Sequence, residues 1–405
     1  MIKTQCCIAG GGPAGIVLGY LLARAGIDVV VLEKHKDFFR DFRGDTIHPS
    51  TLTVLHELGL LEDFLQMPHS EVRRLSGNIS GETLHIADFS HLPGPGKFLA
   101  IIPQWDFLNF LAERGKRFGG FHLLMETEAR SAIVDDGRVC GIRAFARGEE
   151  TNIEADLVVA ADGRSSTLRD QIGGEVINIG APIDALWMRL SKKPGDPQQT
   201  FGTIVPGGIL VAIDRMDYYQ CAFVIKKGAF AEMQRNGLEA FRARVATIAP
   251  FLADRVGELQ TWDDVKLLTV AVNRLKTWSG PGLLFIGDAA HAMSPVGGVG
   301  INLAVQDAVA AANLLTEALR AGVPTEAELA RVQQRRERPT RQTQSLQVFL
   351  QDRIINRVLD SRGRISVPWF VKLLNVFPIL RQIPARVVGL GFRPEHVRTR
   401  ALHGP

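Results

Sequence analysis

Cysteine is scarce in this sequence: four of the 405 residues are cysteine, at positions 6, 7, 140 and 221. They form no CxxC pair and no spacing typical of a zinc site, so we expect buried, reduced thiols and no metal. Uninterrupted apolar runs of about 18 residues are also missing, which argues against a transmembrane helix. Residues 1–4 lead directly into a strand-like segment and lack the form of a secretory signal, so we expect a cytoplasmic protein.

Neither sign of charge dominates, since 47 Lys and Arg stand against 43 Asp and Glu. That near balance gives no indication of nucleic-acid binding, and we expect none. With 22% charged and 46% hydrophobic residues, the composition is that of an ordinary globular protein. The chain is longer than one core usually serves, so two or more packed units are expected.

Glycine, by contrast, is abundant, and one cluster of it follows the first predicted strand, at residues 4–9. A GxGxxG motif at 10–15 joins this strand to a segment of helical periodicity, and an acid, Glu33, ends the apolar strand at 28–32. Glycines at such a turn let a pyrophosphate approach the free N–H groups of the helix, while the acid accepts hydrogen bonds from a ribose. This βαβ unit predicts an adenine dinucleotide, either FAD or NAD, bound by Gly10, Gly12, Pro13, Ala14, Gly15, Glu33 and Lys34.

Two later motifs indicate FAD. Residues 162–169 have the form DGxxSxxR, and residues 287–291 read GDAAH after an apolar strand and before a glycine-rich segment at 295–302. With these motifs the sequence resembles the para-hydroxybenzoate hydroxylase family, the single-component (group A) FAD-dependent monooxygenases. It is most similar to the aromatic-ring and ubiquinone-biosynthesis hydroxylase branches. The resemblance covers most of residues 1–320 and depends on three motifs in the family's order.

The resemblance implies roles for particular residues. Asp288 would hydrogen-bond the ribityl chain of FAD, and Asp162 and Gly163 would lie near its pyrophosphate. The backbone of residues 295–302 would face the pyrimidine end of the flavin, where N–H groups at a helix N-terminus stabilise negative charge. The implied cofactor contacts further include Arg43, Gln104, Gly287, Pro295, Gly298, Gly300, Ile301 and Asn302. Relatives often have Gln and Gly at positions 299 and 304, where this chain has Val and Ala, but backbone contacts survive both changes.

Three residues are candidates for the catalytic site. His48 lies in a loop expected to pass the isoalloxazine. Pro295 is expected to shape residues 295–302, called the flavin segment below. Tyr218 is on a strand that faces either substrate or core. His291, within the GDAAH motif, is expected to pack locally rather than to act as a base. Two interpretations remain for three further residues, which either line a hydrophobic pocket or belong to the plain core: Trp187, Met188 and Phe223.

The order of elements predicts an α/β fold with a Rossmann-like FAD-binding domain of the glutathione reductase type. That domain is expected to be discontinuous, with residues 1–75, 97–180 and 270–325. An antiparallel-sheet substrate domain is interleaved with it, with residues 76–96 and 181–269. C-terminal helices occupy 326–405, the first of them over 326–359. Ser50 is expected to cap a helix that begins at residue 51.

The resemblance implies an enzyme that hydroxylates a small aromatic compound. NADPH or NADH would reduce FAD, and O₂ would then form a flavin C4a-hydroperoxide that transfers one oxygen atom to the substrate. No second GxGxxG follows a strand, so we expect a transient NAD(P)H site rather than a second nucleotide domain. The WxWxIP motif of flavin-dependent halogenases is absent. The alternative is an FAD-dependent reductase or dehydrogenase of the same fold, without oxygen insertion.

The C-terminal region is basic, with fifteen Lys or Arg and four Asp or Glu in residues 331–405. Apolar residues at 369–377 lie near several of these cations, which leaves a peripheral membrane contact open. The simpler interpretation is a helix packed on the FAD-binding domain. A homodimer is also left open.

Overall fold

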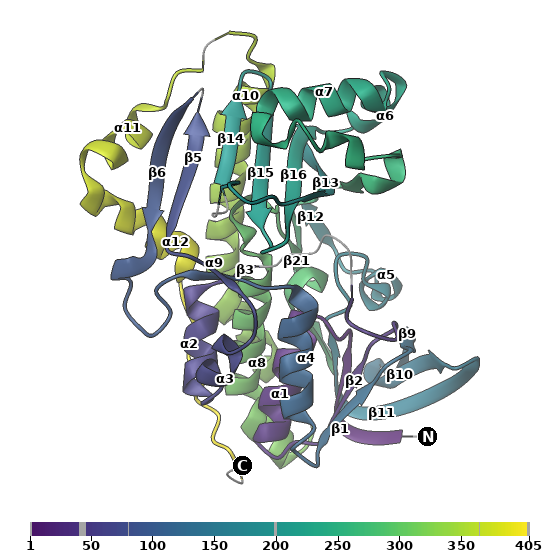
Figure 1. The fold of residues 1–405 in the computed structure, drawn as a ribbon. Coiled ribbons are helices and arrows are strands. Elements are labelled where there is room, and N and C mark those ends of the chain that lie inside the picture. Colours follow the sequence, from purple (N-terminus) through teal and green to yellow (C-terminus); the bar gives the residue numbers. More distant parts are fainter. Residues whose placement is uncertain (1, 40–45, 80, 198–200, 364, 403–405) are drawn as a thin grey trace.

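The computed structural model of the protein (Figure 1) describes residues 2–39, 46–79, 81–197, 201–363 and 365–402. Two large sheets lie one above the other in the view of Figure 1, and two small sheets and long helices join them. The predicted mixed α/β architecture is therefore confirmed. Arg43, one of the expected cofactor contacts, lies outside the described residues.

The lower sheet is built on parallel strands, in the spatial order β20 (Leu283–Phe285), β11 (Glu149–Ala160), β1 (Ile2–Ala9), β2 (Val29–Leu32) and β8 (Phe121–Leu124). One edge continues into β19 (Ser279–Gly280), and β11 also pairs with an antiparallel hairpin of β9 (Thr127–Asp135) and β10 (Arg138–Ala146). The hairpin turns at Asp136 and Gly137, both with positive φ, as their sequence predicts. The central strands are continuous apolar runs because both faces of this sheet are covered.

Three helices cover one face of the lower sheet and share a hydrophobic core with it: α1 (Pro13–Arg24), α4 (Gln104–Gly115) and α8 (Gly300–Ala321). The stretch Val296–Ala321 is long and apolar enough to cross a membrane, but 72% of its most apolar window is buried inside the protein. It packs between α1 and α9 (Glu326–Leu350). A buried core helix passes the same test of length and composition.

The upper sheet has seven strands in the order β17 (Lys266–Leu268), β13 (Ile183–Ser191), β16 (Tyr218–Lys226), β15 (Gly208–Asp214), β14 (Phe201–Val205), β5 (Arg74–Ile79) and β6 (Glu82–Asp88). Neighbouring strands are antiparallel, as expected, except β14 and β5, which run parallel. Helices α6 (Phe230–Arg235) and α7 (Leu238–Ile248) cover one face and bury every second residue of β13 and β16.

Two three-stranded sheets lie between the large ones (Figure 1). Their strands are β3 (Thr46–Ile47), β7 (Leu99–Ile101) and β4 (Ser70–Val72), and β12 (Val176–Asn178), β18 (Asn273–Leu275) and β21 (His291–Ala292). The short helices are α2 (Pro49–Glu57), α3 (Leu61–Leu65) and α5 (Thr167–Ile172). Single 3₁₀ turns occur at Phe89–His91, Pro250–Leu252, Val256–Glu258, Trp262–Asp264, Gly287–Ala289, Val296–Gly298 and Pro378–Arg381.

The predicted N-cap of α2 is wrong. The helix starts at Pro49, and the N-cap position is His48, which has extended backbone. Proline is favoured at the first helical position because its missing N–H would find no partner there. Ser50 lies inside the helix, and its hydroxyl is 2.6 Å from Asn302 Oδ1 and 3.1 Å from the Gly389 carbonyl oxygen.

The helix expected over residues 326–359 is present, with one irregularity. It starts with a capping box between Thr325 and Glu328 and passes from α9 through a π-helical turn, Gln351–Ile355, into α10 (Asn356–Asp360). Helices α11 (Trp369–Val376) and α12 (Gln382–Gly389) follow. The expectation that this region packs on the FAD-binding domain is wrong for α11. It packs on β6 of the upper sheet, where Asn375 Oδ1 accepts a hydrogen bond from His85 N at 3.0 Å.

Candidate active site

The carboxyl ends of four neighbouring parallel strands meet at one edge of the lower sheet, and an expected cofactor residue follows each of them. Gly10 follows β1, Glu33 follows β2, Asp162 comes shortly after β11, and Gly287 comes shortly after β20. In open α/β sheets this edge is where ligands bind. The fold thus brings together three motifs that are far apart in the sequence.

The glycine turn has no room for side chains at its two ends. Gly10 has φ +106°, and a Cβ there would collide with the carbonyl oxygen of Ala161, while a Cβ at Gly15 would collide with that of Gly10. At Gly12 a Cβ would meet nothing within 4 Å, and no described side chain caps α1. The turn is therefore closely packed at Gly10 and Gly15. It is open at Gly12, directly before the first N–H groups of α1. This cradle fits the pyrophosphate of FAD.

Two acids flank the glycine turn. Glu33 is buried, and its Oε1 accepts a hydrogen bond from His35 N at 3.0 Å, whereas the neighbouring Lys34 is exposed. Asp162 Oδ2 accepts a hydrogen bond from Thr167 N at 2.9 Å, but its buried Oδ1 has no partner among the described atoms. Burial raises the pKa of Asp162, and hydrogen bonds from the following turn oppose that rise. A buried acceptor without a partner fits a donor supplied by a ligand.

Asp288, expected at the ribityl chain, lies in the 3₁₀ turn after β20. Its Oδ2 is 3.2 Å from Nη2 of Arg164, and both side chains are about one-third exposed. The turn itself is tied to α8, because Gly287 N donates to Asp307 Oδ2 at 3.1 Å. The Arg164–Asp288 pair links the DGxxSxxR motif to the GDAAH motif at this edge of the lower sheet, called the cofactor edge below.

The segment after the GDAAH motif turns through Gly297 and Gly298, with φ of +83° and +63°, into α8. Pro295 is half-buried, and its carbonyl oxygen accepts a hydrogen bond from Gly298 N at 3.0 Å. Within the described residues no side chain caps α8, so the N–H groups of its first turn have no side-chain acceptor. The N-terminus of so long a helix favours negative charge.

Helix α9 holds this flavin segment in place. Gln347 Nε2 donates to the carbonyl oxygens of Ser294 (2.9 Å) and Val296 (2.8 Å), and Gln347 Oε1 accepts from Ser294 N at 3.1 Å. One turn earlier, Gln344 Nε2 donates to the carbonyl oxygens of Asn273 and Ala292. No sequence motif marks these two glutamines, and neither was predicted. Their spacing on one face of a polar helix was the only available signal.

His48 is fully buried and does not face an open pocket. Its Nδ1 is 2.7 Å from the Val388 carbonyl oxygen, and its Nε2 is 3.0 Å from that of Gly298. Burial lowers the pKa of His48, and the two carbonyl contacts oppose this with a smaller effect. Asn302 also turns toward α2, where its Oδ1 accepts a hydrogen bond from the Thr51 hydroxyl at 3.0 Å. Both side chains therefore bind the start of α2 to the flavin segment.

The N-terminus of α4 connects the cofactor edge to the upper sheet. Helix α4 begins at Gln104, directly after β7, and β7 pairs with β3 beside His48. Asp106 lies in the first turn of α4. The β15–β16 hairpin, which carries Arg215, turns at the end of the upper sheet that faces the lower sheet (Figure 1). Burial raises the pKa of Asp106, and the positive charge of Arg215 opposes that rise. This end of the upper sheet therefore faces the side of the molecule that holds Gln104, which the resemblance implies as a flavin contact.

Strand alternation separates the candidate pocket residues. Met188 and Phe223 belong to the core under α7, so plain core is the correct interpretation for these two. Tyr219 is buried in the same core. Trp187 and Tyr218 lie on the opposite face of the sheet, where Tyr218 is half-buried. Tyr219 therefore belongs to the core, whereas Tyr218 lies on the face away from α7.

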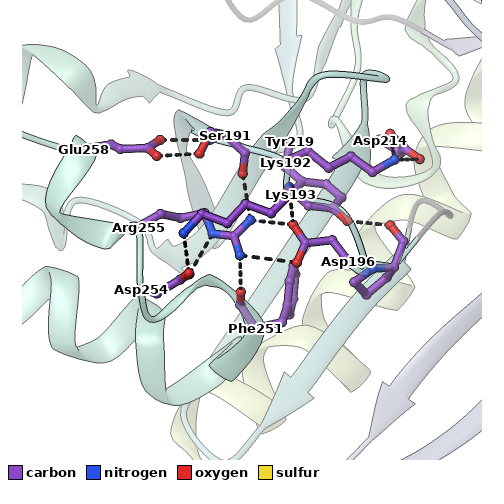
Figure 2. Close-up of polar contacts among 11 residues, drawn as sticks. Ser191, Lys192, Lys193, Asp196, Asp214, Tyr219, Phe251, Asp254, Arg255 and Glu258 are labelled. Atoms are coloured by element: carbon purple, nitrogen blue, oxygen red, sulfur yellow. Dashed lines mark hydrogen bonds and ion pairs between the residues drawn. The ribbon is translucent and has the colours of Figure 1, made fainter.

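A buried polar network fixes the hairpin that carries Arg215 (Figure 2). Lys192 Nζ lies 2.9 and 2.8 Å from the two carboxylate oxygens of Asp214, and both side chains are 7% exposed. Asp214 Oδ1 also accepts a hydrogen bond from Met216 N at 3.0 Å. Met216 has φ +68°, a conformation uncommon for a non-glycine residue, and these contacts hold it.

Four buried charged or titratable groups lie behind the flavin segment. His291 Nε2 is 2.5 Å from Asp307 Oδ2, Arg336 Nε donates to Asp307 Oδ1 at 2.9 Å, and Arg336 Nη1 is 3.4 Å from Glu395 Oε1. His291 was expected to pack locally, but its ring contacts Asp307 of α8, sixteen residues along the chain. The other three were missed because no local motif marks them. Among the described residues, no three His, Cys, Asp or Glu side chains are placed to hold a metal ion.

Comparison with known proteins identifies relatives over nearly the whole chain. A family described as FAD binding domain matches residues 3–345. The chain is 32% identical over 391 residues to 6-methylpretetramide 4-monooxygenase of Streptomyces rimosus, covering 95% of this chain and 92% of that enzyme. It is 25% identical over 353 residues to protoasukamycin 4-monooxygenase of Streptomyces nodosus subsp. asukaensis, covering 81% of this chain and 83% of that protein.

A solved structure with the same fold is PqsL of P. aeruginosa in complex with 2-aminobenzoylacetate. It aligns with a TM-score of 0.76 at 22% identity, covering 88% of this chain and 98% of that chain. At this identity the similarity establishes the fold.

Proposed function

This chain belongs to the FAD binding domain family that matches residues 3–345, and from this premise we propose that it uses NAD(P)H and O₂ to hydroxylate a small aromatic compound. It is an FAD-dependent monooxygenase, because its family is described as an FAD binding domain and both relatives are named as monooxygenases. The observation that carries the proposal is the convergence of the three motifs at one sheet edge, beside the uncapped N-terminus of α8. NAD(P)H as the electron donor is the finer part of the proposal. It follows from the resemblance to the group A monooxygenases, and the lack of a second GxGxxG motif after a strand is compatible with a transient NAD(P)H site.

Each group at this edge would hold one part of FAD. The Gly10–Gly15 turn would take the pyrophosphate, Glu33 the adenosine ribose, and Asp288 the ribityl chain. Bound FAD supplies hydride acceptance from NAD(P)H and activation of O₂, which no side chain provides. The N–H groups at the start of α8 would stabilise negative charge at the pyrimidine end of the reduced ring.

The remaining residues position the reactants and exclude water. We assign the lower sheet and its helices to the FAD-binding domain and the upper sheet to the substrate domain, which covers the site and keeps it dry. Pro295 and Tyr218 are the proposed active-site contacts of the flavin segment and of the substrate sheet. His48 is a positioning residue, because both of its ring nitrogens already contact backbone carbonyl oxygens.

The test is a measurement of bound FAD followed by isotope tracing. The purified protein is assayed for released FAD, and then for NADPH and NADH oxidation with a panel of phenols and aromatic ketones under ¹⁸O₂. Incorporation of one ¹⁸O atom into a product supports the proposal. Oxidation of NAD(P)H with product formation but no ¹⁸O in the product would instead indicate a reductase. Failure to bind FAD after reconstitution would contradict the proposal itself.

A further inference from the structure

Two buried hydrogen-bond donors on the upper sheet have no acceptor. Trp187 is 9% exposed and Gln220 is 5% exposed. Within the part of the chain that the structure describes, neither Trp187 Nε1 nor Gln220 Nε2 has a hydrogen-bond partner. Burying an N–H group without an acceptor is costly, so an acceptor from outside the described residues, either an ordered water or a ligand, is expected at each donor.

Both donors lie on the face opposite α7. Trp187 pairs with Ala222 across β13 and β16, and Gln220 pairs with Arg189, so the two donors are diagonal neighbours on one face. On β15, Val211 pairs with Ala222 and Ile213 with Gln220, which provides apolar floor beside the donors. No described strand residue of β13, β15 or β16 on this face is Asp or Glu. A flat aromatic body with oxygen acceptors on one edge fits this surface.

Arg215 determines which group of the Gln220 amide, the oxygen or the NH₂, can bind a ligand. Arg215 Nη2 lies 3.2 Å from the Gln220 side chain, and a guanidinium group can only donate hydrogen bonds. The amide oxygen must therefore face Arg215, and the NH₂ group must point away from it. Arg215 belongs to the β15–β16 hairpin, which turns at the end of the upper sheet that faces the lower sheet (Figure 1), so this orientation is set at the end nearer the proposed flavin site.

We propose that Trp187 and Gln220 are specificity-determining donors that bind carbonyl or phenolate oxygens of the aromatic substrate. The proposal rests on the function proposed above and adds the chemical class of substrate: an aromatic ring that carries at least one oxygen acceptor, oriented by two N–H donors over an apolar floor. An aromatic hydrocarbon of the same size would leave both donors without acceptors and would bind more weakly.

The test compares two probes of similar size on the FAD-loaded enzyme by equilibrium dialysis. They are 2-acetyl-1-naphthol, which has adjacent phenol and ketone oxygens, and 2-ethylnaphthalene, which has no oxygen. The unmodified enzyme should bind the first at least about tenfold more tightly. Trp187→Phe and Gln220→Met each remove the proposed donor and leave an apolar side chain of similar size, and Gln220→Met also removes the acceptor of Arg215 Nη2. Each should reduce this preference about tenfold, with FAD content and 2-ethylnaphthalene affinity unchanged.

Met188→Leu is the matched control, because Met188 is next to Trp187 but points into the core under α7, and it should change neither affinity. Binding of both probes equally, or of neither, by the unmodified enzyme overturns the proposal. So does an equal loss of both probes in the two variants, which would show a packing role. If the variants lose the preference but no compound gains ¹⁸O, the proposed function fails and the assignment of the donors stands. If ¹⁸O is incorporated but the preference is unchanged, only the assignment of the donors fails.

Discussion

Replacing Asp307 by Asn should destabilise the protein more than any exposed charge change. Asp307 is fully buried on α8 and accepts hydrogen bonds from His291, Arg336 and Gly287 N. Burial opposes ionisation of this carboxyl group, but His291 and Arg336 together outweigh burial and lower its pKa. The substitution keeps the size of the side chain and removes its charge, so Arg336, which is 1% exposed, loses its shortest ion-pair contact.

The expected loss in the free energy of unfolding is about 3 kcal/mol, at the lower end of the range for breaking one partner of a buried ion pair. It is at the lower end because Arg336 keeps the Arg393 carbonyl oxygen at 3.1 Å and Glu395 at 3.4 Å. The FAD affinity should also fall, since Asp307 ties down the turn at Gly287. Because the pKa of Asp307 is lowered, its contribution is complete above the ordinary value of 3.8 and is lost as the pH falls below it.

The assay is urea unfolding of the FAD-loaded enzyme at neutral pH, followed by flavin and tryptophan fluorescence. Glu154→Gln is the control, because Glu154 pairs with Lys3 at 3.0 Å with side chains that are 42% and 74% exposed. An exposed pair of this kind is worth about 0.5 kcal/mol or less. A loss of less than about 1 kcal/mol for Asp307→Asn would refute the reasoning, since it would mean that Arg336 needs no buried carboxylate at this position.

Three further predictions concern the cofactor edge. Gly15→Ala should weaken FAD binding at least about tenfold, because its Cβ would collide with the Gly10 carbonyl oxygen. Titration of the apoprotein measures this, and Gly119→Ala, at an exposed position with nothing within 4 Å, should bind FAD normally. Gln347→Leu removes three hydrogen bonds from the flavin segment. It should lower the hydroxylation rate about tenfold and increase the release of H₂O₂. Unchanged coupling of NAD(P)H oxidation to product formation would argue against this role. Burial lowers the pKa of His48 from 6.5, so its contribution to stability is present above that pH and is lost below it. His48→Gln should flatten the fall in unfolding free energy below pH 6.5, and a slope equal to that of the unmodified enzyme would contradict this assignment.

Most of the lower sheet and its cofactor edge could be predicted because their signals are local. The Gly10–Gly15 turn, the acid at Glu33 and the GDAAH motif each report a backbone requirement within a few residues. The same local reasoning failed at Ser50, where the helix begins two residues earlier than predicted because Pro49 occupies its first position.

The sequence alone therefore determined the family of fold, the cofactor and the order of the motifs along the chain, since these depend on neighbouring residues. Only the tertiary structure decided which partner each buried polar group has. Asp307 meets Arg336 from α9 and Glu395 lies beside the same arginine, yet no spacing or periodicity relates these positions. Alternation showed that Trp187 and Met188 point to opposite faces, but only the packing of α7 against one face decided that Trp187 lies on the other. Hydrogen bonds between distant segments depend on how whole layers stack, and a linear pattern does not carry that information.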